Sequence, residues 1–594
     1  MEQDTKSRRS SDDTLSANNT NAVPELPKEE VFDDDSKVPF LTARTFFMTV
    51  LVSMGGICFG YDTGQISGFL EMENFKRNFA DDRVTQPNGD VTLNLTPVRT
   101  GLLVATLSLG TLVGALIAGP VANNRKLGRK YSICMWCAVF CIGNIFQLSA
   151  QYPYWYVLMI GRIIAGFAVG GLSVLVPAYQ GESAPTHLRG AIVCCYQLFI
   201  TIGILIAYLI NFGTETINAD STASWRIPMG ISFLWALILG FGILFFPETP
   251  RHDFRHGAVE KASESIARFY GVSPRHKVVK KQLKEMQEKL RIEQEGGDHS
   301  IWEVFTGPRM FYRLMLGMSI QALQQMTGAN FFFYYGTTIF ESVGINNSFV
   351  TQIILGAVNV VTTFPGLYMV EKFGRRKCLT LGAGWMFMCF MVFASLGNSA
   401  LQSGTDANGD PIYDSTIGYV MIVFACLFIA AFASTWGPMA WAVTSEIYPS
   451  RYRSTAIAFC AASNWAFNFF IGFATPFIVA DIGFAYGYLF AACNFVAVLV
   501  VFFFLPETSG KSLEVIDTMF LLEVKPWKSS GWVPPPSEEL VTADQLRLTH
   551  GGRDIRKTNE AGVGDDTKYE NVEESRANSV NMGASGARGN SLTV

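Results

Sequence analysis

The sequence has few charged residues and no large excess of either sign. Asp, Glu, Lys and Arg make up 16% of the 594 residues, whereas an average soluble protein has about 25%. The formal net charge of −4 gives no positive field that would attract nucleic acid. A hydrophobic content of 49% and a mean hydropathy of +0.24 exclude a disordered chain and disfavour an ordinary soluble enzyme. The composition is that of a membrane protein.

The 11 cysteines form neither a disulfide framework nor a metal-binding pattern. All lie within or beside apolar runs, where small buried thiols are common. The closest group is Cys134, Cys137 and Cys141, and no His lies within its run. No nucleophile–base pair or cofactor motif is found either. We therefore expect no enzymatic activity, no cofactor and no metal.

Twelve apolar segments are each long enough to cross a bilayer, which takes about 20 residues. They lie near 44–66, 98–121, 131–149, 155–178, 190–212, 226–246, 313–340, 350–370, 378–397, 417–444, 455–480 and 485–505. The first follows a polar start and lacks the form of a signal peptide, so we expect no cleavage. The fold class predicted is an all-α membrane protein with 12 transmembrane helices.

Most short loops divide into a basic set and a set without basic residues. Lys and Arg follow the second, eighth and tenth segments, whereas the loops near 149–154, 341–349, 398–416 and 481–484 contain none. Because basic loops stay in the cytoplasm, both termini are predicted to be cytoplasmic. The sequons at Asn94 and Asn346 then fall outside and are predicted glycosylation sites.

The polar segments divide the chain into five parts. Residues 1–43 and 506–594 are predicted to be cytoplasmic tails, the first disordered and the second mostly so. Two six-helix halves, 44–246 and 313–505, are joined by a linker at 247–312. The mixed charge and helical periodicity of the linker predict short amphipathic helices on the cytoplasmic face.

An internal repeat supports the two halves. Leu127-Gly128-Arg129-Lys130 recurs as Phe373-Gly374-Arg375-Arg376, and Pro247-Glu248-Thr249 recurs as Pro506-Glu507-Thr508. Glu182-Ser183-Ala184-Pro185 recurs loosely as Glu446-Ile447-Tyr448-Pro449. The offsets between the copies are nearly constant, which argues against coincidence.

At these residues the sequence resembles the sugar porter family of the major facilitator superfamily, most closely fungal hexose transporters. The resemblance covers roughly 44–517. Its further markers are Gly60-Tyr61-Asp62-Thr63-Gly64, Gly161-Arg162, Pro177-x-Tyr179-x-x-Glu182, Pro247-Glu248-Thr249-Pro250-Arg251 and Gln324-Gln325-x-x-Gly328-x-Asn330. One position departs from the family: Arg125, after Asn123 and Asn124, stands where the first loop usually has Asp, whereas the second copy keeps its acid as Glu371.

Neutral amides inside the apolar segments are the candidate sugar ligands. An amide supplies donors and an acceptor for hydroxyls without the desolvation cost of a charge. Gly328 permits a helix break that turns neighbouring amides toward one cavity. The alternative is that the amides only link helices. The candidates are Gln197, Gln324, Gln325, Asn330, Asn359 and Asn464.

Aromatic residues complete the predicted sugar site. The resemblance assigns Trp441 to sugar contact, and the preceding Gly437-Pro438 would let its helix bend; the alternative is an interfacial anchor. Phe59, Tyr334, Tyr335 and Trp465 are candidate gate or wall residues, for which ordinary core packing is an equal alternative.

Two sets of charged residues are candidates for coupling and gating. In the family pattern Asp62 lies near Arg162, and the acid carries the proton in symporters; the alternative is a structural ion pair. The second set is predicted to form two latches between the halves, the alternative being solvated loops. It comprises Arg129, Glu182, Arg189, Glu371, Arg375, Glu446 and Arg453.

The resemblance implies a plasma-membrane hexose transporter, with glucose as the expected substrate, that works by alternating access. Its partners would be the sugar, protons if it is coupled, and membrane lipid, with no nucleic acid. A glucose sensor of transporter fold, with cytoplasmic signalling partners, is the alternative that the long polar tail permits. A channel is disfavoured, because the repeat suits two rocking halves better than an open pore.

Overall fold

The computed structural model describes residue 24 and residues 34–85, 91–217, 221–295, 302–341, 347–405, 411–449 and 452–533. Asn346, the side chain of Glu371 and most of both predicted tails lie outside this part of the chain. What the sequence predicts for them stays a prediction.

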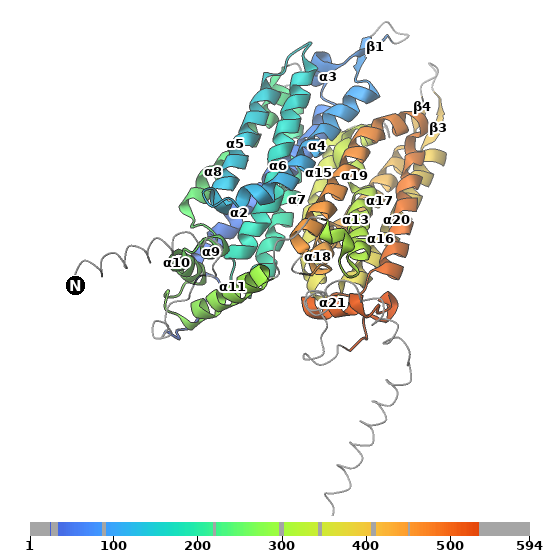
Figure 1. Ribbon diagram of the computed structural model, residues 1–594. Helices are drawn as coiled ribbons and strands as arrows, with labels where there is room; N and C mark the ends of the chain where they lie inside the picture. Colours follow the sequence, from blue (N-terminus) through green and yellow to red (C-terminus); the bar gives the residue numbers. More distant parts are fainter. Residues whose placement is uncertain are drawn as a thin grey trace, which may run out of the picture.

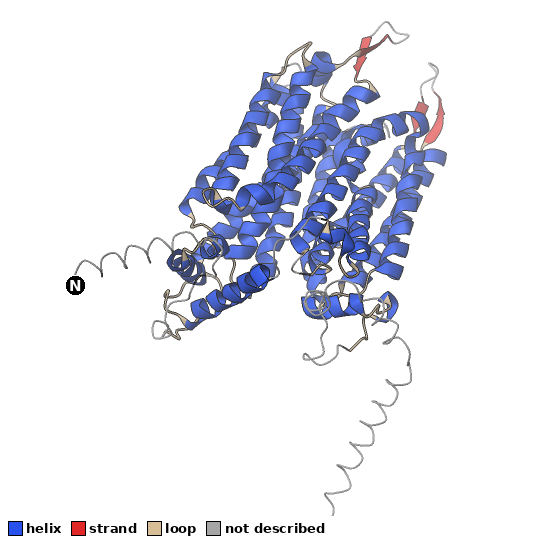
Figure 2. Cartoon of the chain, in the orientation of Figure 1, coloured by secondary structure: helices blue, strands red, loops and turns tan. Residues whose placement is uncertain are grey.

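Two bundles of helices lie side by side (Figure 1), and almost all of the described chain is helical (Figure 2). The first bundle contains α2 (Ala43–Phe69), α4 (Pro97–Ala122), α5 (Gly128–Ser149), α6 (Trp155–Ser183), α7 (Arg189–Ile217) and α8 (Ala223–Gly242). The second contains α13 (Met310–Met326), α14 (Ala329–Glu341), α15 (Ser348–Lys372), α16 (Arg375–Ser399), α17 (Ser415–Ser434), α18 (Trp436–Glu446), α19 (Arg453–Ile482) and α20 (Tyr486–Phe504).

These helices make twelve passages through the bundle. Within the described residues, 10 helical stretches are long and apolar enough to span a membrane. The last of them, Arg453–Phe504, holds two antiparallel passages, α19 and α20, joined by the 3-10 turn η3 (Gly483–Ala485). The broken pair α13 and α14 supplies the remaining passage. The all-α fold with twelve membrane helices is thus confirmed.

Glycines allow the helices of the first bundle to pack backbone to backbone. A Cβ on Gly110 of α4 would lie 2.1 Å from the Ile163 oxygen of α6, and one on Gly170 of α6 would lie 2.2 Å from the Thr111 oxygen. Any side chain would therefore force the two helices apart. Close packing of this kind holds helices together in lipid, where the hydrophobic effect between them is lost.

The two ends of the bundle differ. We call one end the linker face: it carries α9 (Pro250–Arg255), α10 (Val259–Tyr270), α11 (Lys277–Glu295), α12 (Glu303–Thr306), α21 (Leu513–Leu521) and the short turns η2 (Ile243–Phe245) and η4 (Pro526–Lys528). The other end is the hairpin face, with α3 (Glu73–Phe79) and two antiparallel hairpins, β1 (Asp82–Thr85) with β2 (Val91–Asn94) and β3 (Gln402–Thr405) with β4 (Pro411–Tyr413).

The two halves contact each other away from the linker face. Near the hairpin face, Ser67 of α2 shares a hydrogen bond of 2.9 Å with Thr337 of α14. Closer to the centre, Ser108 of α4 donates to Asn468 of α19 at 2.5 Å. In Figure 1 the ribbons of the halves diverge toward the linker face. The bundle is therefore closed at the hairpin face.

The predicted disorder of residues 1–43 is wrong for residues 34–42. The carbonyl of Asp34 accepts from the Lys277 amide at 3.0 Å, and the Asp35 carboxylate pairs with the Lys277 ammonium at 2.7 Å. The His276 ring bonds the Ser36 carbonyl at 2.7 Å. Composition could not predict that this segment is ordered. Its backbone groups are held by hydrogen bonds to the linker, and the segment has no apolar face of its own.

The start of the predicted carboxyl tail also packs against the bundle. Asp517 of α21 pairs with the fully buried Arg313 of α13 at 2.6 Å, and Ile516 and Phe520 are buried beside it. These apolar residues give α21 a face that covers the linker-face end of the second half.

Candidate functional site

The seventh membrane passage is broken where the sequence predicts a break. Helix α13 ends at Met326 and α14 begins at Ala329, with Gly328 between them at φ +97°. A Cβ at Gly328 would meet the Phe390 ring at 2.7 Å, so both the backbone conformation and the space require glycine. The break turns Asn330 back toward α13, where its Nδ2 donates to Gln325 Oε1.

Asn464 of α19 is the centre of an amide cluster. Its Nδ2 donates to Gln324 Oε1 at 2.7 Å, and its Oδ1 accepts from Gln325 Nε2 at 2.9 Å. Gln324 Nε2 also donates to the carbonyls of Trp436 and Gly437 at the start of α18, each at 2.9 Å. Four of the six predicted amides, Gln324, Gln325, Asn330 and Asn464, thus lie in one network.

Two further amides belong to this cluster and were not predicted. Gln321 Oε1 accepts from Asn464 at 2.7 Å, and Asn468 Nδ2 donates to Gln325 Oε1 at 3.1 Å. Gln321 lies about one turn before Gln324, and Asn468 lies one turn after Asn464. Their helical spacing from the predicted amides was the signal that would have found them.

The remaining two predicted amides have free hydrogen-bonding capacity. Gln197 of α7 is half-buried. Its Nε2 lies 3.9 Å from the position that a Cβ would occupy if Gly437 of α18 carried a side chain. Asn359 of α15 is 2% exposed. Neither side chain makes a hydrogen bond to another described residue. Hydrogen bonds between helices therefore account for the presence of Gln324 and Asn464 in apolar helices. They do not account for Gln197 and Asn359.

The helix that carries Trp441 bends earlier than predicted. The break lies at Thr435 (φ −126°, ψ −80°), between α17 and α18, and Gly437-Pro438 falls inside α18. Pro438 has no amide hydrogen for the Ser434 carbonyl, which explains why the regular helix stops just before it. Trp441 lies beyond this break and is 37% exposed.

The four aromatic gate candidates fall into two pairs. Phe59 of α2 and Trp465 of α19 touch edge to face, with ring centroids 5.4 Å apart, and so connect the two halves. Tyr334 donates to Asn468 at 2.9 Å, and Tyr335 donates to the Gly472 carbonyl. The tyrosines therefore tie α14 to α19 within the second half.

Asp62 and Arg162 are fully buried and loosely paired. Their nearest atoms, Asp62 Oδ1 and Arg162 Nη1, are 4.0 Å apart, and Asp62 Oδ1 accepts a hydrogen bond of 2.5 Å from Gln65. Among the described residues, Asp62 Oδ2 and the guanidinium nitrogens of Arg162 have no hydrogen-bond partner. A loose pair in a low-dielectric core can rearrange when the carboxyl gains or loses a proton. Gln65, three residues after Asp62, was not predicted.

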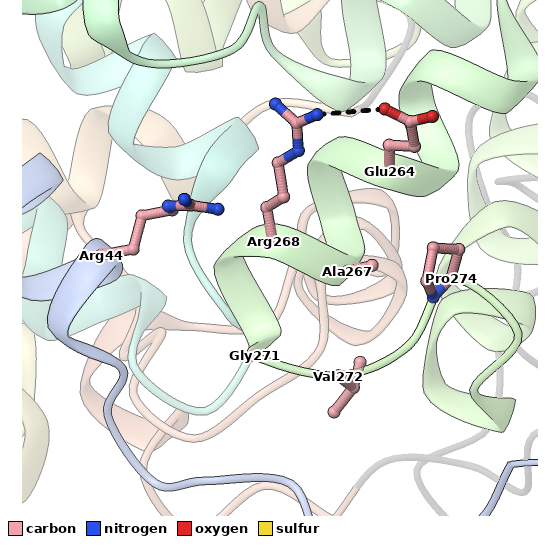
Figure 3. A pocket seen from close by; sticks show the side chains of 7 residues that line it. All are labelled: Arg44, Glu264, Ala267, Arg268, Gly271, Val272 and Pro274. Atoms are coloured by element: carbon pink, nitrogen blue, oxygen red, sulfur yellow. Dashed lines mark hydrogen bonds and ion pairs between the residues drawn. The ribbon is translucent and has the colours of Figure 1, made fainter.

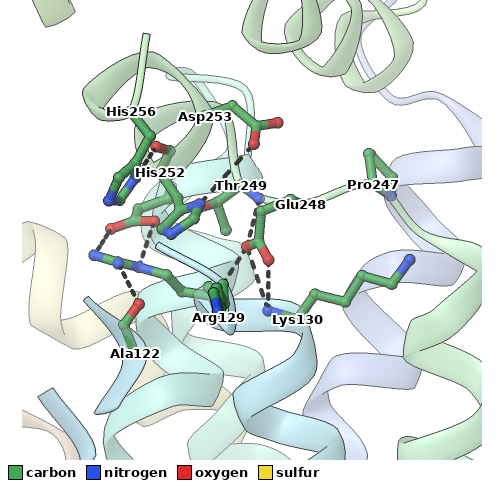
Figure 4. A network of polar contacts seen from close by, with 12 residues as sticks. Ala122, Arg129, Lys130, Pro247, Glu248, Thr249, His252, Asp253 and His256 are labelled. Carbon is green, nitrogen blue, oxygen red and sulfur yellow. Dashed lines mark hydrogen bonds and ion pairs between the residues drawn. The ribbon is translucent and has the colours of Figure 1, made fainter. Parts of the chain in front are cut away.

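In the first half, the charges of the linker face form one network (Figure 4). The guanidinium of Arg129 lies 3.3 Å from the carboxylate of Glu182. Glu248 accepts from the backbone amides of Arg129 and Lys130, each at 3.0 Å, and so caps the start of α5. Asn123 Oδ1 accepts a hydrogen bond of 3.0 Å from the Arg129 guanidinium. Asn123 thus supplies an acceptor in the loop where the resemblance leads one to expect Asp.

The second half repeats this arrangement. Arg375 pairs with Glu446 at 2.9 Å, and Glu507 accepts from the backbone amides of Arg375 at 2.8 Å and Arg376 at 3.2 Å. Arg453 donates to the Tyr448 carbonyl at 3.2 Å within the same half.

No pair among the described members of the predicted latches crosses between the halves. Arg129 and Glu182 belong to the first half and Arg375 and Glu446 to the second. The Nε of Arg189 has no hydrogen-bond partner among the described residues. In this conformation, with the hairpin face closed, the ion pairs Arg129–Glu182 and Arg375–Glu446 each lie inside one half.

A cavity of about 480 Å³ lies beside α10 on the linker face (Figure 3). It is lined by Arg44, Glu264, Ala267, Arg268, Gly271, Val272 and Pro274. None of the predicted sugar ligands lines it. The candidate site is therefore defined by the amide cluster of the second half, by Gln197 and Asn359, and by the Phe59–Trp465 contact between the halves.

Two pseudo-repeated bundles, a broken seventh passage with amides at the break, and paired charge clusters at one face define a membrane carrier of the major facilitator type. The chain matches the sugar (and other) transporter family over residues 48–520, and it belongs to that family. This is a family of transporters rather than enzymes.

Three relatives show how close the match is. The chain is 44% identical over 486 residues to a low-affinity glucose transporter of Kluyveromyces lactis, covering 82% of this chain and 84% of that protein. It is 40% identical over 552 residues to a low-affinity glucose transporter of Saccharomyces cerevisiae, covering 91% and 95%. A high-affinity fructose transporter of Schizosaccharomyces pombe is 43% identical over 490 residues, covering 82% and 89%.

Solved structures agree on the fold. A proton:xylose symporter of the major facilitator superfamily, bound to 6-bromo-6-deoxy-D-glucose, aligns with a TM-score of 0.65 at 25% identity over 80% of this chain and 99% of that one. The partially occluded, inward-open xylose transporter of E. coli aligns with a TM-score of 0.64 at 24% identity, over 79% and 100%.

Proposed function

We propose that this protein transports hexose, with glucose as its main substrate, across the plasma membrane by alternating access. The observation that carries the proposal is the free hydrogen-bonding capacity of Gln197 and Asn359, which come from opposite halves and have no partner among the described residues. A sugar held between the halves would satisfy both amides. The relatives named as glucose and fructose transporters support this substrate class over a sensing role.

The orientation follows from the basic loops. Arg129 and Arg375 lie at the start of helices on the linker face, and these basic residues support our proposal that this face and both termini are cytoplasmic. The hairpin face would then be outside, and the exposure of Asn94 at the end of β2 supports the proposal that it is a glycosylation acceptor. In this orientation the structure represents a state that is closed to the outside.

Proton coupling is proposed through Asp62. Its carboxyl is buried beside Arg162 at 4.0 Å, and a solved structure with the same fold is a proton:xylose symporter. Protonation of Asp62 would release Arg162 from its charge partner and change the balance between the two states of the carrier.

The test is uptake of labelled glucose in a cell that lacks its own hexose carriers. Gln197→Leu and Asn359→Leu each leave a sugar hydroxyl without a partner, at a cost of about 1–3 kcal/mol, so KM should rise roughly 5- to 150-fold. The matched control is Asn494→Leu, because Asn494 already donates to the carbonyls of Thr327 and Phe490 inside the second half. That variant should lose stability and keep its KM.

Two results would count against the proposal. Equal KM values for wild type, Gln197→Leu and Asn359→Leu at normal surface expression would remove these amides from the sugar site. Sugar binding without any uptake would instead favour a receptor.

A further inference from the structure

Helix α4 of the first half and helix α19 of the second half are in contact along a line that runs inward from the hairpin face. Near that face, a Cβ on Gly101 of α4 would lie 2.7 Å from the Phe473 carbonyl oxygen of α19. About one turn deeper, a Cβ on Gly472 would lie 3.3 Å from the Ala105 Cα. The two backbones therefore lie close together while the hairpin face is closed.

Ser108 lies about one turn further along α4 than Ala105, and it makes a polar contact on the same line. Its side chain is buried, and its hydroxyl donates to Asn468 Oδ1 of α19 at 2.5 Å. The same oxygen accepts a hydrogen bond of 2.9 Å from the Tyr334 hydroxyl of α14. The Asn468 oxygen thus has two buried donors, one from each half.

The other end of the Asn468 amide belongs to the amide cluster. Its Nδ2 donates to Gln325 Oε1 at 3.1 Å. Gln325 in turn donates to Asn464 Oδ1 at 2.9 Å, and its oxygen also accepts from Asn330. The orientation of the Asn468 amide is therefore matched at both ends, because its oxygen meets two hydroxyl donors and its nitrogen meets an acceptor.

Two other hydrogen bonds between the halves have no connection of this kind. Ser67 of α2 bonds to Thr337 of α14 at 2.9 Å, and the Tyr208 hydroxyl of α7 donates to the Phe333 carbonyl at 3.3 Å. Neither bond ends on a member of the amide cluster. Within the part of the chain that the structure describes, Ser108 is the side chain of the first half that hydrogen-bonds to this cluster.

We propose that Ser108 is a positioning residue that couples closure of the hairpin face to the amide cluster, and that it acts through Asn468. While the face is closed, the Ser108 hydroxyl holds the Asn468 amide with its nitrogen toward Gln325. When α4 moves away from α19, the Asn468 oxygen loses this donor and keeps only the one from Tyr334. The proposal rests on alternating access as the proposed function.

The direction of the effect follows from the state in which the bond exists. The bond between Ser108 and Asn468 stabilises the state with a closed hairpin face and is broken when that face opens. Ser108→Ala should therefore shift the equilibrium toward the open state. The loss of one buried hydrogen bond should lower the ratio of closed to open molecules roughly 2- to 10-fold.

Single-molecule fluorescence energy transfer measures this ratio directly, in the full-length protein in nanodiscs without sugar. The two dyes are attached through unnatural amino acids at Asp82 of β1 and Gln402 of β3, which are exposed positions on different halves. Ser108→Ala and Asn468→Ala should each lower the ratio of closed to open molecules. When both changes are combined, Ser108→Ala should add no further loss, because both variants remove the same bond.

Two control variants separate this coupling from a general weakening of the contact. Thr111 is also buried on α4, but its hydroxyl donates to the Leu107 carbonyl of its own helix at 2.8 Å, so Thr111→Val should keep the wild-type ratio. Ser67→Ala breaks a separate bond between the halves, and its effect should add to that of Asn468→Ala. An unchanged ratio in Ser108→Ala, or a full further loss when it is added to Asn468→Ala, would overturn the proposal.

Glucose transport gives an independent readout. Because Ser108→Ala favours the open hairpin face, the KM for glucose should fall at that face and rise at the linker face. A variant that is merely less stable would have fewer active carriers and unchanged KM values at both faces. If the protein carries no glucose, uptake fails in every variant while the energy-transfer measurement still tests Ser108. KM values that change in the same direction at both faces would contradict the proposal.

Discussion

The two halves of the bundle share a scaffold but differ in the chemistry of their cores. On the linker face, Glu248 and Glu507 each accept two backbone amides at the start of a helix, α5 in one half and α16 in the other. Within the membrane, the first half buries a charged pair, Asp62 and Arg162, whereas the second half buries neutral amides around Asn464. The repeat therefore preserves the frame of each half, while the buried polar groups of the two cores differ: a charged pair in the first half and the amide cluster in the second.

The largest expected effect concerns the amides of the second half. In Gln325→Ala or Asn330→Ala, sugar hydroxyls and the partner amide lose hydrogen bonds in a desolvated site, at about 1–3 kcal/mol. Glucose affinity should fall roughly 5- to 150-fold, measured by binding to the purified protein. Gln65→Ala, which removes an amide of the first half that bonds Asp62, is the matched control and should leave affinity nearly unchanged. If Gln65→Ala lost as much glucose affinity as Gln325→Ala or Asn330→Ala, the buried amides of the two halves would not differ in their role in binding.

The next effect concerns the charged pair of the first half. Asp62→Asn keeps the shape of the side chain and a partner for Gln65, but it cannot exchange a proton. The variant should lose uphill accumulation of sugar and keep sugar exchange, because exchange returns the carrier loaded. The measurement is accumulation in vesicles with and without a protonophore. Accumulation that stays sensitive to the protonophore would take Asp62 out of the proton path.

The smallest effect concerns the shared scaffold. Glu248→Gln and Glu507→Gln each remove a negative charge from the start of a helix. Such a charge stabilises a helix by about 0.3–1 kcal/mol. We expect the two variants to lower the thermal stability by similar amounts, measured by thermal unfolding in detergent. Glu264→Gln is the control, since Glu264 forms an exposed pair with Arg268. A large loss in one half alone would show that the two networks are not equivalent.

Much of the architecture was predictable because hydropathy is local. The predicted span 98–121 corresponds to α4 (Pro97–Ala122), and 155–178 falls within α6 (Trp155–Ser183). The break at Gly328 was also predictable, since glycine tolerates the positive φ found there. The bend before Trp441 was predicted too late in the chain, because the effect of Pro438 falls on the preceding turn.

The candidate site was predictable in its residue types and only partly in its contacts. A family motif pointed to Gln324 and Gln325, and the apolar run around Asn464 made this amide a candidate. Nothing in the local pattern showed that the Asn464 side chain forms hydrogen bonds with both glutamines. Gln321 and Asn468 were missed, although helical spacing places them next to predicted residues. The docking of residues 34–42 on the linker was missed because it depends on partners more than 200 residues away, such as His276 and Lys277.

The sequence by itself determined that this is a twelve-helix membrane carrier of two halves, because chain length, apolar runs and a repeat are properties that need no tertiary contacts. The tertiary structure decided which polar groups are free and which are already bonded. It satisfied Gln324 within the protein, left Gln197 and Asn359 open, and placed the ion pairs Arg129–Glu182 and Arg375–Glu446 each inside one half. The physical reason is that a hydrogen bond or an ion pair depends on distances of a few ångströms between residues far apart in the chain.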